Sequence, residues 1–185
     1  MTRLLERYKN EIHSSLKEKL GINNPMAIPR LTKVVLSMGV GEAIKDKNRM
    51  AGALAGLARV TGQAPQIRRS RKSVSNFKLR DGMDIGCRVT LRGRRMYEFV
   101  DRLINAAIPR LRDFRGLNPR SFDGHGNYSM GLADQTVFAE IDQGSVTYSQ
   151  GMNITFVTTA EDDAAGRELL TMMGMPFRKT QEQKN

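Results

Sequence analysis

The 185-residue sequence is poor in the residues on which most metal proteins and many enzymes depend. It has one cysteine, Cys87, and two histidines, His13 and His125. One cysteine excludes an internal disulfide, and these three residues are too few for a zinc cluster. No apolar run approaches the roughly 20 residues that span a bilayer, and the charged N-terminus lacks the apolar stretch of a signal peptide. We therefore expect a globular, cytosolic protein without a metal, a cofactor or a membrane-spanning segment.

Signatures of nucleotide binding and catalysis are also missing. After the glycine pair at 39 and 41, the third glycine of a dinucleotide-binding loop would fall at Ile44, and no Gly-Lys-Ser/Thr is present. Asp123, His125 and Ser129 share one loop, but no nucleophile elbow accompanies them, and neighbouring loop residues rarely have triad geometry. The RNP1 pattern of RRM domains is absent. We expect no catalytic residues, although a small-molecule enzyme remains an alternative.

Positive charge, in contrast, is in excess and is unevenly distributed. The formal net charge is +11 and the pI is near 10.2. Residues 68–120 carry a net +10, whereas residues 121–177 carry −7. An excess of this size causes self-repulsion and indicates a polyanionic partner, for which RNA, DNA and an anionic membrane surface are the candidates. For a cytosolic protein we expect no membrane among the partners. The segregation predicts a polyanion site in the middle of the chain and a different kind of partner for the acidic stretch.

Hydrophobic periodicity predicts an α+β fold in one domain, residues 1–185. Helical spacing marks residues 5–20, 50–60, 97–111 and about 162–173, the last with a capping-box-like start at Thr159 and Asp162. Strands are expected at 31–38, after Pro65, at 85–92, at 135–141 and at 152–158. Residues 70–84 are expected to form a basic loop, 116–131 a second loop and 178–185 a flexible tail. About five strands with helices on one face would result.

One expected sheet face is basic. Arg88, Thr90 and Arg92 alternate with apolar residues, and no acidic residue interrupts them. A solvated strand face would look similar, but this one would repel itself without an anion. If the strands pair, five further polar residues share the face: Lys33, Ser37, Gln66, Arg68 and Ser70. Such side chains suit phosphate and 2′-hydroxyl contacts.

The expected loop is the second basic feature. Six basic residues, from Arg68 to Arg80, precede its first acidic residue. Charge this dense favours an extended, mobile segment that can follow a phosphate backbone, although a solvated linker is the alternative. Phe77 could stack on a base or anchor the loop to the core.

These same regions carry a family resemblance. The blocks are residues 35–43, 61–63, 71–74, 86–93, 108–117, 121–124, 126–131 and 176–177. The Arg-Asp-Phe-Arg-Gly and Gly-Asn-Tyr-Ser-Met-Gly blocks are the most specific. In this order, over nearly the whole chain, the blocks resemble the bacterial ribosomal protein L5 family. Ser37 stands where that family usually has Asn, Gln66 and Arg68 replace commoner apolar and Thr residues, and His125 replaces an Arg.

The resemblance implies a structural, cytoplasmic protein of the large ribosomal subunit with a curved, mostly antiparallel sheet. It implies contacts with 5S rRNA, 23S rRNA, other 5S-binding proteins, P-site tRNA and a small-subunit head protein across an intersubunit bridge. The residues expected at rRNA are Lys33, Ser37, Met38, Gln63, Gln66, Arg68, Arg88, Thr90 and Arg92. Those expected at tRNA are Arg71, Lys72, Ser73, Asn76, Phe77, Lys78, Arg80 and Gly82. Those expected at the bridge are Arg110, Arg112, Asp113, Phe114, Arg115, Glu140 and Asp142. An RNA-binding translation or assembly factor is the second reading.

Overall fold

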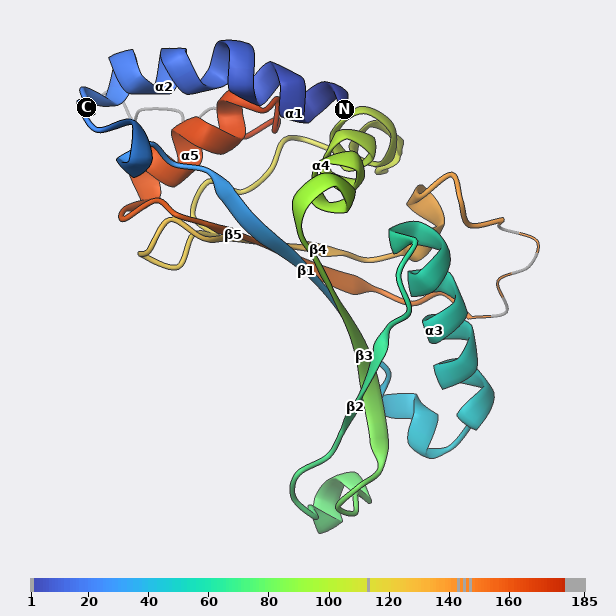
Figure 1. Ribbon diagram of the computed structural model, residues 1–185. Helices are drawn as coiled ribbons and strands as arrows, with labels where there is room; N and C mark the ends of the chain where they lie inside the picture. The colour runs from blue at the N-terminus through green and yellow to red at the C-terminus, as the bar shows by residue number, and fades with distance from the viewer. Residues whose placement is uncertain (1, 113, 143, 145, 147, 179–185) are drawn as a thin grey trace, which may run out of the picture. The chain divides into compact units, whose positions relative to one another are not determined.

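A computed structural model of the protein describes residues 2–112, 114–142, 144, 146 and 148–178. The α-helices are α1 (Arg3–Arg7), α2 (His13–Leu20), α3 (Lys47–Thr61), α4 (Gly93–Arg102) and α5 (Asp163–Met172) (Figure 1). The strands are β1 (Leu31–Gly39), β2 (Gln66–Arg69), β3 (Asp84–Leu91), β4 (Tyr128–Leu132) and β5 (Met152–Thr158). A π-helical turn, Tyr8–Ile12, joins α1 to α2, and another, Leu103–Ala107, extends α4. The four predicted helices are confirmed.

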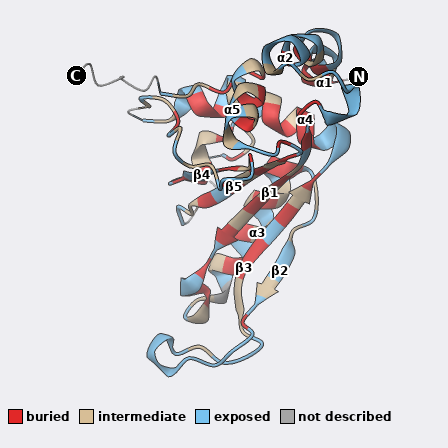
Figure 2. Ribbon diagram, turned by 90° about the vertical axis from the view of Figure 1, so that its left-hand side faces the viewer, coloured by how far each residue is buried: buried red, intermediate tan, exposed pale blue. Residues whose placement is uncertain are grey.

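The strands form one open, antiparallel sheet in the order β2-β3-β1-β5-β4. The expected α+β class with a mostly antiparallel sheet of about five strands is confirmed. Burial alternates along each of the three central strands. In β3, for example, Cys87, Val89 and Leu91 are buried, whereas Arg88 is exposed (Figure 2). This period of two places apolar side chains on one face and polar side chains on the other.

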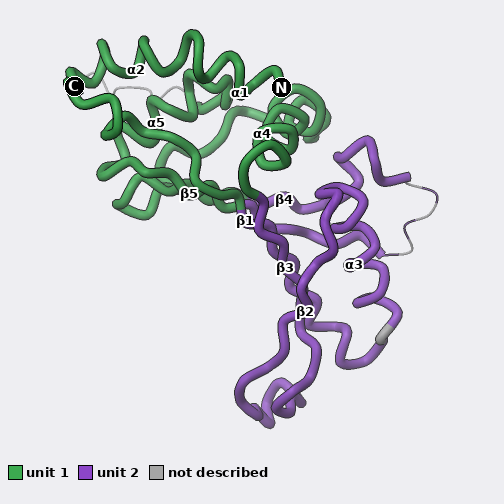
Figure 3. Tube along the Cα trace, viewed as in Figure 1, with its two compact units in different colours: residues 1–34, 92–130, 155–185 green, residues 35–91, 131–154 purple. Residues whose placement is uncertain are grey.

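The chain folds into two compact units, coloured separately in Figure 3. Unit 1 comprises residues 1–34, 92–130 and 155–185, and unit 2 comprises residues 35–91 and 131–154. In unit 2, α3 packs on β3 and buries Leu57 and Val60 completely. In unit 1, α1 packs on α4 and α2 packs on α5. Because each unit is assembled from two or three segments, a single cut in the chain cannot separate them.

The predicted strand at 135–141 is wrong. Asp134 accepts a hydrogen bond from the backbone N–H of Thr136 (2.9 Å) and begins a short 3-10 turn, Gln135–Val137. The missing strand is β4, which lies inside the predicted loop. Tyr128, Met130 and Leu132 are buried there, alternating with exposed residues. Five residues with a glycine among them gave too short a pattern to stand out.

The predicted start of the last helix also needs a correction. Asp162 alone caps α5, because its side chain accepts the N–H of Ala165 (2.8 Å). The Thr159 hydroxyl instead accepts the backbone N–H of Arg30 (3.0 Å). In the part of the chain that the structure describes, no helix has both the length and the apolar character of a membrane span.

Candidate nucleic-acid interface

Strands β2 and β3 bring four predicted rRNA residues onto one face of unit 2. Gln66 pairs with Arg88 and Arg68 pairs with Gly86, in antiparallel register. Directly paired residues point to the same side of a sheet, so Gln66 and Arg68 share a face with Arg88 and Thr90. Their neighbours Ile67 and Cys87, also paired, point to the opposite face. The structure therefore assembles this part of the expected surface.

An irregularity in the pairing removes the acidic residue from that face. The register shifts between Arg68 and Arg69, so that Arg69 pairs with Asp84. Both residues turn to the side of Ile67, with which they line one cavity, and their side chains form an ion pair at 3.1 Å. A bulge re-aims side chains in this way. Arg68 and Arg88 have no ion-pair partner among the described residues, so their charge remains available to an anion.

Gln63 is held beside this face by the end of α3. The helix ends at Gly62, whose φ of 64° is left-handed. The Thr61 hydroxyl donates to the carbonyl of Leu57 (2.7 Å) and accepts the N–H of Gln63 (3.3 Å). The Gln63 amide then donates to the carbonyl of Thr90 (3.4 Å). Two predicted rRNA residues, 27 positions apart in the sequence, are thereby placed side by side.

The other predicted rRNA residues are distributed along β1 and at the start of α4. Ser37 is half-buried on β1 in unit 2. Met38, the next residue of β1, is only 2% exposed as a whole residue. Lys33, half-buried, and Arg92, exposed, belong to unit 1. The prediction of all four as rRNA contacts stays a prediction.

The outer positions of β4 and β5 are also polar, and the sequence reading missed them. Ser129 and Thr155 in unit 1 lie with their hydroxyl oxygens 3.0 Å apart. Asn153, in unit 2, is exposed on β5. The signal was present, because each alternates with buried apolar residues. For Ser129 the pattern is too short to predict a strand within the expected loop at 116–131.

The basic loop is a closed hairpin rather than the extended segment that we expected. Val74 and Leu79 exchange backbone hydrogen bonds of 2.9 and 3.1 Å. At its base, Ser70 donates its N–H to the carbonyl of Met83 (2.8 Å) and accepts that of Gly82 (3.1 Å). Four exposed basic residues project from it, which we call the hairpin cations: Arg71, Lys72, Lys78 and Arg80. None has an ion-pair partner among the described residues.

The hairpin tip presents an aromatic side chain to solvent. A 3-10 turn, Ser75–Phe77, leaves Phe77 75% exposed. Lys78 follows with a φ of 52°, and it is the one residue other than glycine with positive φ in the described part of the chain. Phe77 therefore does not anchor the loop to the core. Ser73 and Asn76 are exposed as well, and the Ser73 hydroxyl accepts the N–H of Asp81 (3.0 Å).

The bridge residues fall into two groups that belong to different units. In unit 1, Arg110, Arg112 and Arg115 are exposed and Phe114 is half-buried, whereas Asp113 lies outside the described residues. In unit 2, Glu140 and Asp142 lie beyond the 3-10 turn, not at a strand end. Asp142 accepts the N–H of Gly144 (3.0 Å).

The loop with Asp123, His125 and Ser129 has a structural arrangement. The Asp123 carboxylate accepts the backbone N–H groups of His125 (2.9 Å) and Asn127 (3.1 Å) and the Asn127 side-chain amide (2.8 Å). The Asn127 amide, with the His125 N–H, lowers the pKa of Asp123. Ser129 bonds to Thr155 and not to His125. No nucleophile–base pair forms, and no cluster of three or more metal-ligating side chains occurs among the described residues.

The fold and this surface define a class: an α+β protein that presents basic side chains on a sheet face and on a hairpin, as nucleic-acid-binding proteins do. Two family profiles match the chain. The profile described as ribosomal protein L5 covers residues 24–80, and that described as the ribosomal L5P family C-terminus covers residues 84–177.

Curated relatives agree with the profiles. The large ribosomal subunit protein uL5 of Rubrobacter xylanophilus is 56% identical over 178 residues, covering 96% of this chain and 99% of that protein. The protein of the same name from Salinispora tropica is 55% identical over 179 residues, covering 97% and 95%. That of Heliobacterium modesticaldum is 51% identical over 178 residues, covering 96% and 99%. The chain belongs to the ribosomal protein L5 family, whose members are structural rather than enzymatic.

Proposed function

We propose that this ribosomal protein, a structural component of the large subunit in the cytoplasmic ribosome, holds 5S rRNA through the polar sheet face around β2 and β3. The hairpin cations contact P-site tRNA, and the two bridge groups meet a small-subunit head protein. Contacts with 23S rRNA and with other 5S-binding proteins complete its place in the particle.

One observation carries the 5S rRNA proposal. Arg68 and Arg88 lie on the same face of paired strands, while the bulge turns the local acid, Asp84, to the other face. Two free guanidinium groups beside the Gln66 amide and the Thr90 hydroxyl can donate to phosphate and ribose oxygens together. Such a donor-rich face suits recognition of RNA through its phosphate and 2′-hydroxyl groups.

The hairpin suits a second RNA for a different reason. Its backbone hydrogen bonds are made within the hairpin, so the hairpin is formed without a ligand. The hairpin cations and the Phe77 ring are therefore already exposed to solvent before RNA binds. A basic finger with an exposed aromatic ring at its tip can pair with phosphates and stack on a base. The acidic residues Glu140 and Asp142 would be repelled by RNA, so a basic protein is the fitting partner for that segment.

The test is binding of the purified chain to 5S rRNA over a range of salt concentrations. If five or six phosphates are contacted, log K should fall with log salt with a slope of about −4 to −5. Arg88→Ala should weaken binding and reduce the slope by about 1. Arg94→Ala is the matched control, because Arg94 is exposed but paired with Glu98 at 2.8 Å on α4. A flat salt dependence, or equal affinity for unrelated RNA of the same length, would refute the proposal.

A further inference from the structure

A cavity of about 420 Å³ in unit 1 forms where segments distant in the sequence meet. It lies beside the helical run of α1 and α2, the start of β1, α4 and the residue after β5. The polar groups on its wall are Tyr8, Lys9, Arg30, Thr32, Tyr97 and Thr159. None of the lining residues is acidic. The cavity shares no residue with the sheet face assigned above to 5S rRNA.

Hydrogen bonds fix the segments that form this cavity. The Tyr8 hydroxyl donates to the carbonyl of Pro29 (2.9 Å). Next to it, the backbone of Arg30 is bonded twice to Thr159: its N–H donates to the hydroxyl, and its carbonyl accepts the Thr159 N–H, both at 3.0 Å. The start of β1 is thereby tied both to the N-terminal helices and to the end of β5. The base of the Arg30 side chain is held in place without a ligand.

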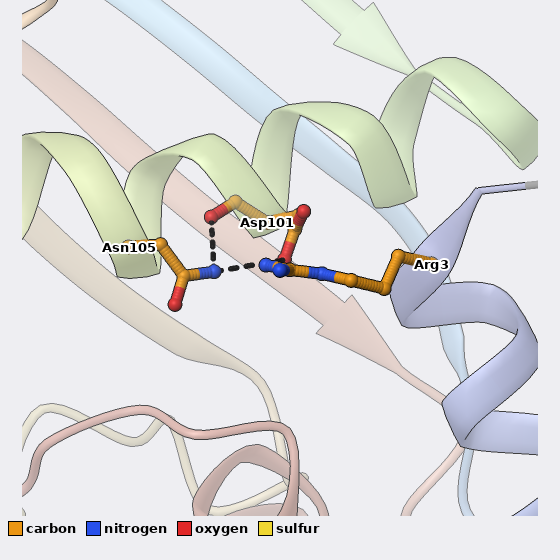
Figure 4. A network of polar contacts seen from close by, with 3 residues as sticks. All are labelled: Arg3, Asp101 and Asn105. Carbon is orange, nitrogen blue, oxygen red and sulfur yellow. Dashed lines mark hydrogen bonds and ion pairs between the residues drawn. The ribbon is translucent and has the colours of Figure 1, made fainter.

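A second network joins α1 to α4, which carries Tyr97 (Figure 4). The guanidinium of Arg3 forms an ion pair with Asp101 at 2.8 Å, and the Asn105 amide donates to the side chain and the carbonyl of Asp101, also at 2.8 Å. Asp101 is four residues beyond Tyr97, so both lie on one side of α4. The Tyr97 ring faces Tyr8, with ring centres 6.3 Å apart. The aromatic wall is therefore fixed as well.

The Tyr97 hydroxyl is a donor without a partner. The residue is only 6% exposed, yet its hydroxyl makes no hydrogen bond among the described residues. Two side-chain polar atoms of the described residues are fully buried without a hydrogen-bond partner, Thr2 Oγ1 and Gln135 Oε1. The Tyr97 hydroxyl is not one of them. The Tyr97 hydroxyl is therefore not fully sealed from solvent, and Tyr97 is one of the residues that line the cavity. Burial raises the pKa of Tyr97 to about 12, so the group stays protonated and able to donate near neutral pH.

Two positive charges stand at the same cavity. The side chains of Lys9 and Arg30 are exposed and have no ion-pair partner in the described part of the chain. Arg30 is close enough to lower the pKa of both Tyr8 and Tyr97 against the effect of burial. The ammonium, the guanidinium, the Tyr97 phenol and the Thr32 hydroxyl are all hydrogen-bond donors, and their residues line the same cavity.

We propose that this cavity binds a phosphodiester group of ribosomal RNA, with the attached ribose against the Tyr8 and Tyr97 rings. Lys9 and Arg30 neutralise the phosphate, and the Tyr97 hydroxyl donates to one of its oxygens. The volume exceeds what a lone phosphate fills, and the tyrosine rings supply an apolar wall that a sugar can cover. The inference rests on the proposed RNA binding and adds a separate contact in unit 1. The phosphate belongs to either the 5S or the 23S strand.

The experiment measures binding of the full chain to purified 5S rRNA and, separately, to purified 23S rRNA across a salt series. Tyr97→Phe removes the hydroxyl alone and should weaken binding to one of these RNAs about tenfold, the effect of losing one hydrogen bond to a charged group. Lys9→Ala should reduce the salt slope for that same RNA by about 1. Lys17→Ala is the matched control, since Lys17 is an exposed cation of α2 away from the cavity lining.

The outcomes separate this site from the sheet face. If Tyr97→Phe and Lys9→Ala bind both RNAs with wild-type affinity and wild-type salt slope, the cavity proposal is overturned. The sheet proposal would be unaffected, because Arg88→Ala tests it separately. An equal loss in Lys17→Ala and Lys9→Ala would also overturn it, because only the general charge would then matter. Losses confined to Tyr97→Phe and Lys9→Ala, with unchanged melting temperatures, support it and identify the strand.

Discussion

Two backbone segments of unit 1 approach each other closely where α5 meets the loop at Gly126, and the contact predicts the direction of a stability change. Gly166 faces Gly126, and a Cβ atom added at Gly166 would lie 2.5 Å from the Gly126 carbonyl oxygen and 2.9 Å from its Cα. The same contact is held from α5 by Asp163, whose carboxylate accepts the N–H groups of Gly124 and Gly126, both at 3.0 Å. Gly126 itself has a φ of 70°, so the loop cannot easily change shape to make room.

The effect of Gly166→Ala is the difference between two opposing terms. Alanine is favoured over glycine inside a helix by about 0.8–1 kcal/mol. Against this, forcing a methyl group into a packed site costs roughly 1–3 kcal/mol, and a displaced α5 would also stretch the two Asp163 hydrogen bonds, each contributing about 1.5–3 kcal/mol as bonds to a charged group. The clash involves backbone atoms, which cannot rotate away. We expect Gly166→Ala to lower the free energy of unfolding by about 1–3 kcal/mol.

The control is Gly52→Ala in α3, an exposed helical glycine with no atom within 4 Å of the added Cβ. Helix propensity acts there without a clash, so stability should rise by about 0.5–1 kcal/mol. For a chain of this length, 1 kcal/mol shifts the melting temperature by about 2–4 °C. Thermal unfolding of the two variants should therefore shift in opposite directions. If Gly166→Ala stabilises the protein as much as Gly52→Ala does, the close contact under α5 is wrong.

Three further predictions concern function and chemistry. Replacing all four hairpin cations with Ala should leave melting and 5S rRNA binding nearly unchanged, since the hairpin bonds are backbone bonds, but should speed tRNA dissociation from reconstituted ribosomes; unchanged dissociation rejects the tRNA assignment. The double variant Glu140→Lys with Asp142→Lys should weaken subunit association at low salt, by about 0.2–1 kcal/mol per exposed ion pair, and the difference should shrink as salt rises. Asp142→Asn is the control for the local structure, because the amide oxygen can still accept the N–H of Gly144. Burial raises the pKa of the Cys87 thiol to about 11, so folding favours the protonated thiol. This contribution to stability is present below the pKa of the unfolded chain and declines as pH rises toward 11. At pH 8, alkylation of Cys87 should occur only through unfolding.

Local patterns in the sequence were enough to predict the helices and most strands. Residues 85–92 alternate without interruption, so both the strand and its polar face could be read directly. Gly21 and Gly62 end helices for a reason that is purely local, since both have left-handed φ. The stretch 135–141 fits a strand by its β-branched and aromatic residues, but Asp134 caps a 3-10 turn there. The Gln135 N–H also donates to the carbonyl of Gln150, a bond between distant segments that a local pattern does not show.

Much of the candidate site could not be predicted, because it depends on pairing between distant segments. Strict alternation along β3 would place Asp84 on the polar face with Arg88. The shift in register between β2 and β3 is what turns Asp84 away from that face. Likewise, nothing in the sequence relates Arg30 to Tyr97. The closed form of the hairpin had one faint signal, the apolar pair Val74 and Leu79 in an otherwise polar stretch.

Because the hairpin is closed by its own bonds, its length can change without a change in the sheet. Its base is fixed by Ser70, Gly82 and Met83, and the bonds beyond that base join hairpin residues only to one another. Deleting one facing pair of residues between base and tip should shorten the finger by about 3.3 Å, the rise of one strand residue, while β2 and β3 keep their register. The hairpin can thus serve as a spacer. The number of its residues sets the distance that it reaches toward a partner, and the binding face of the sheet stays unchanged.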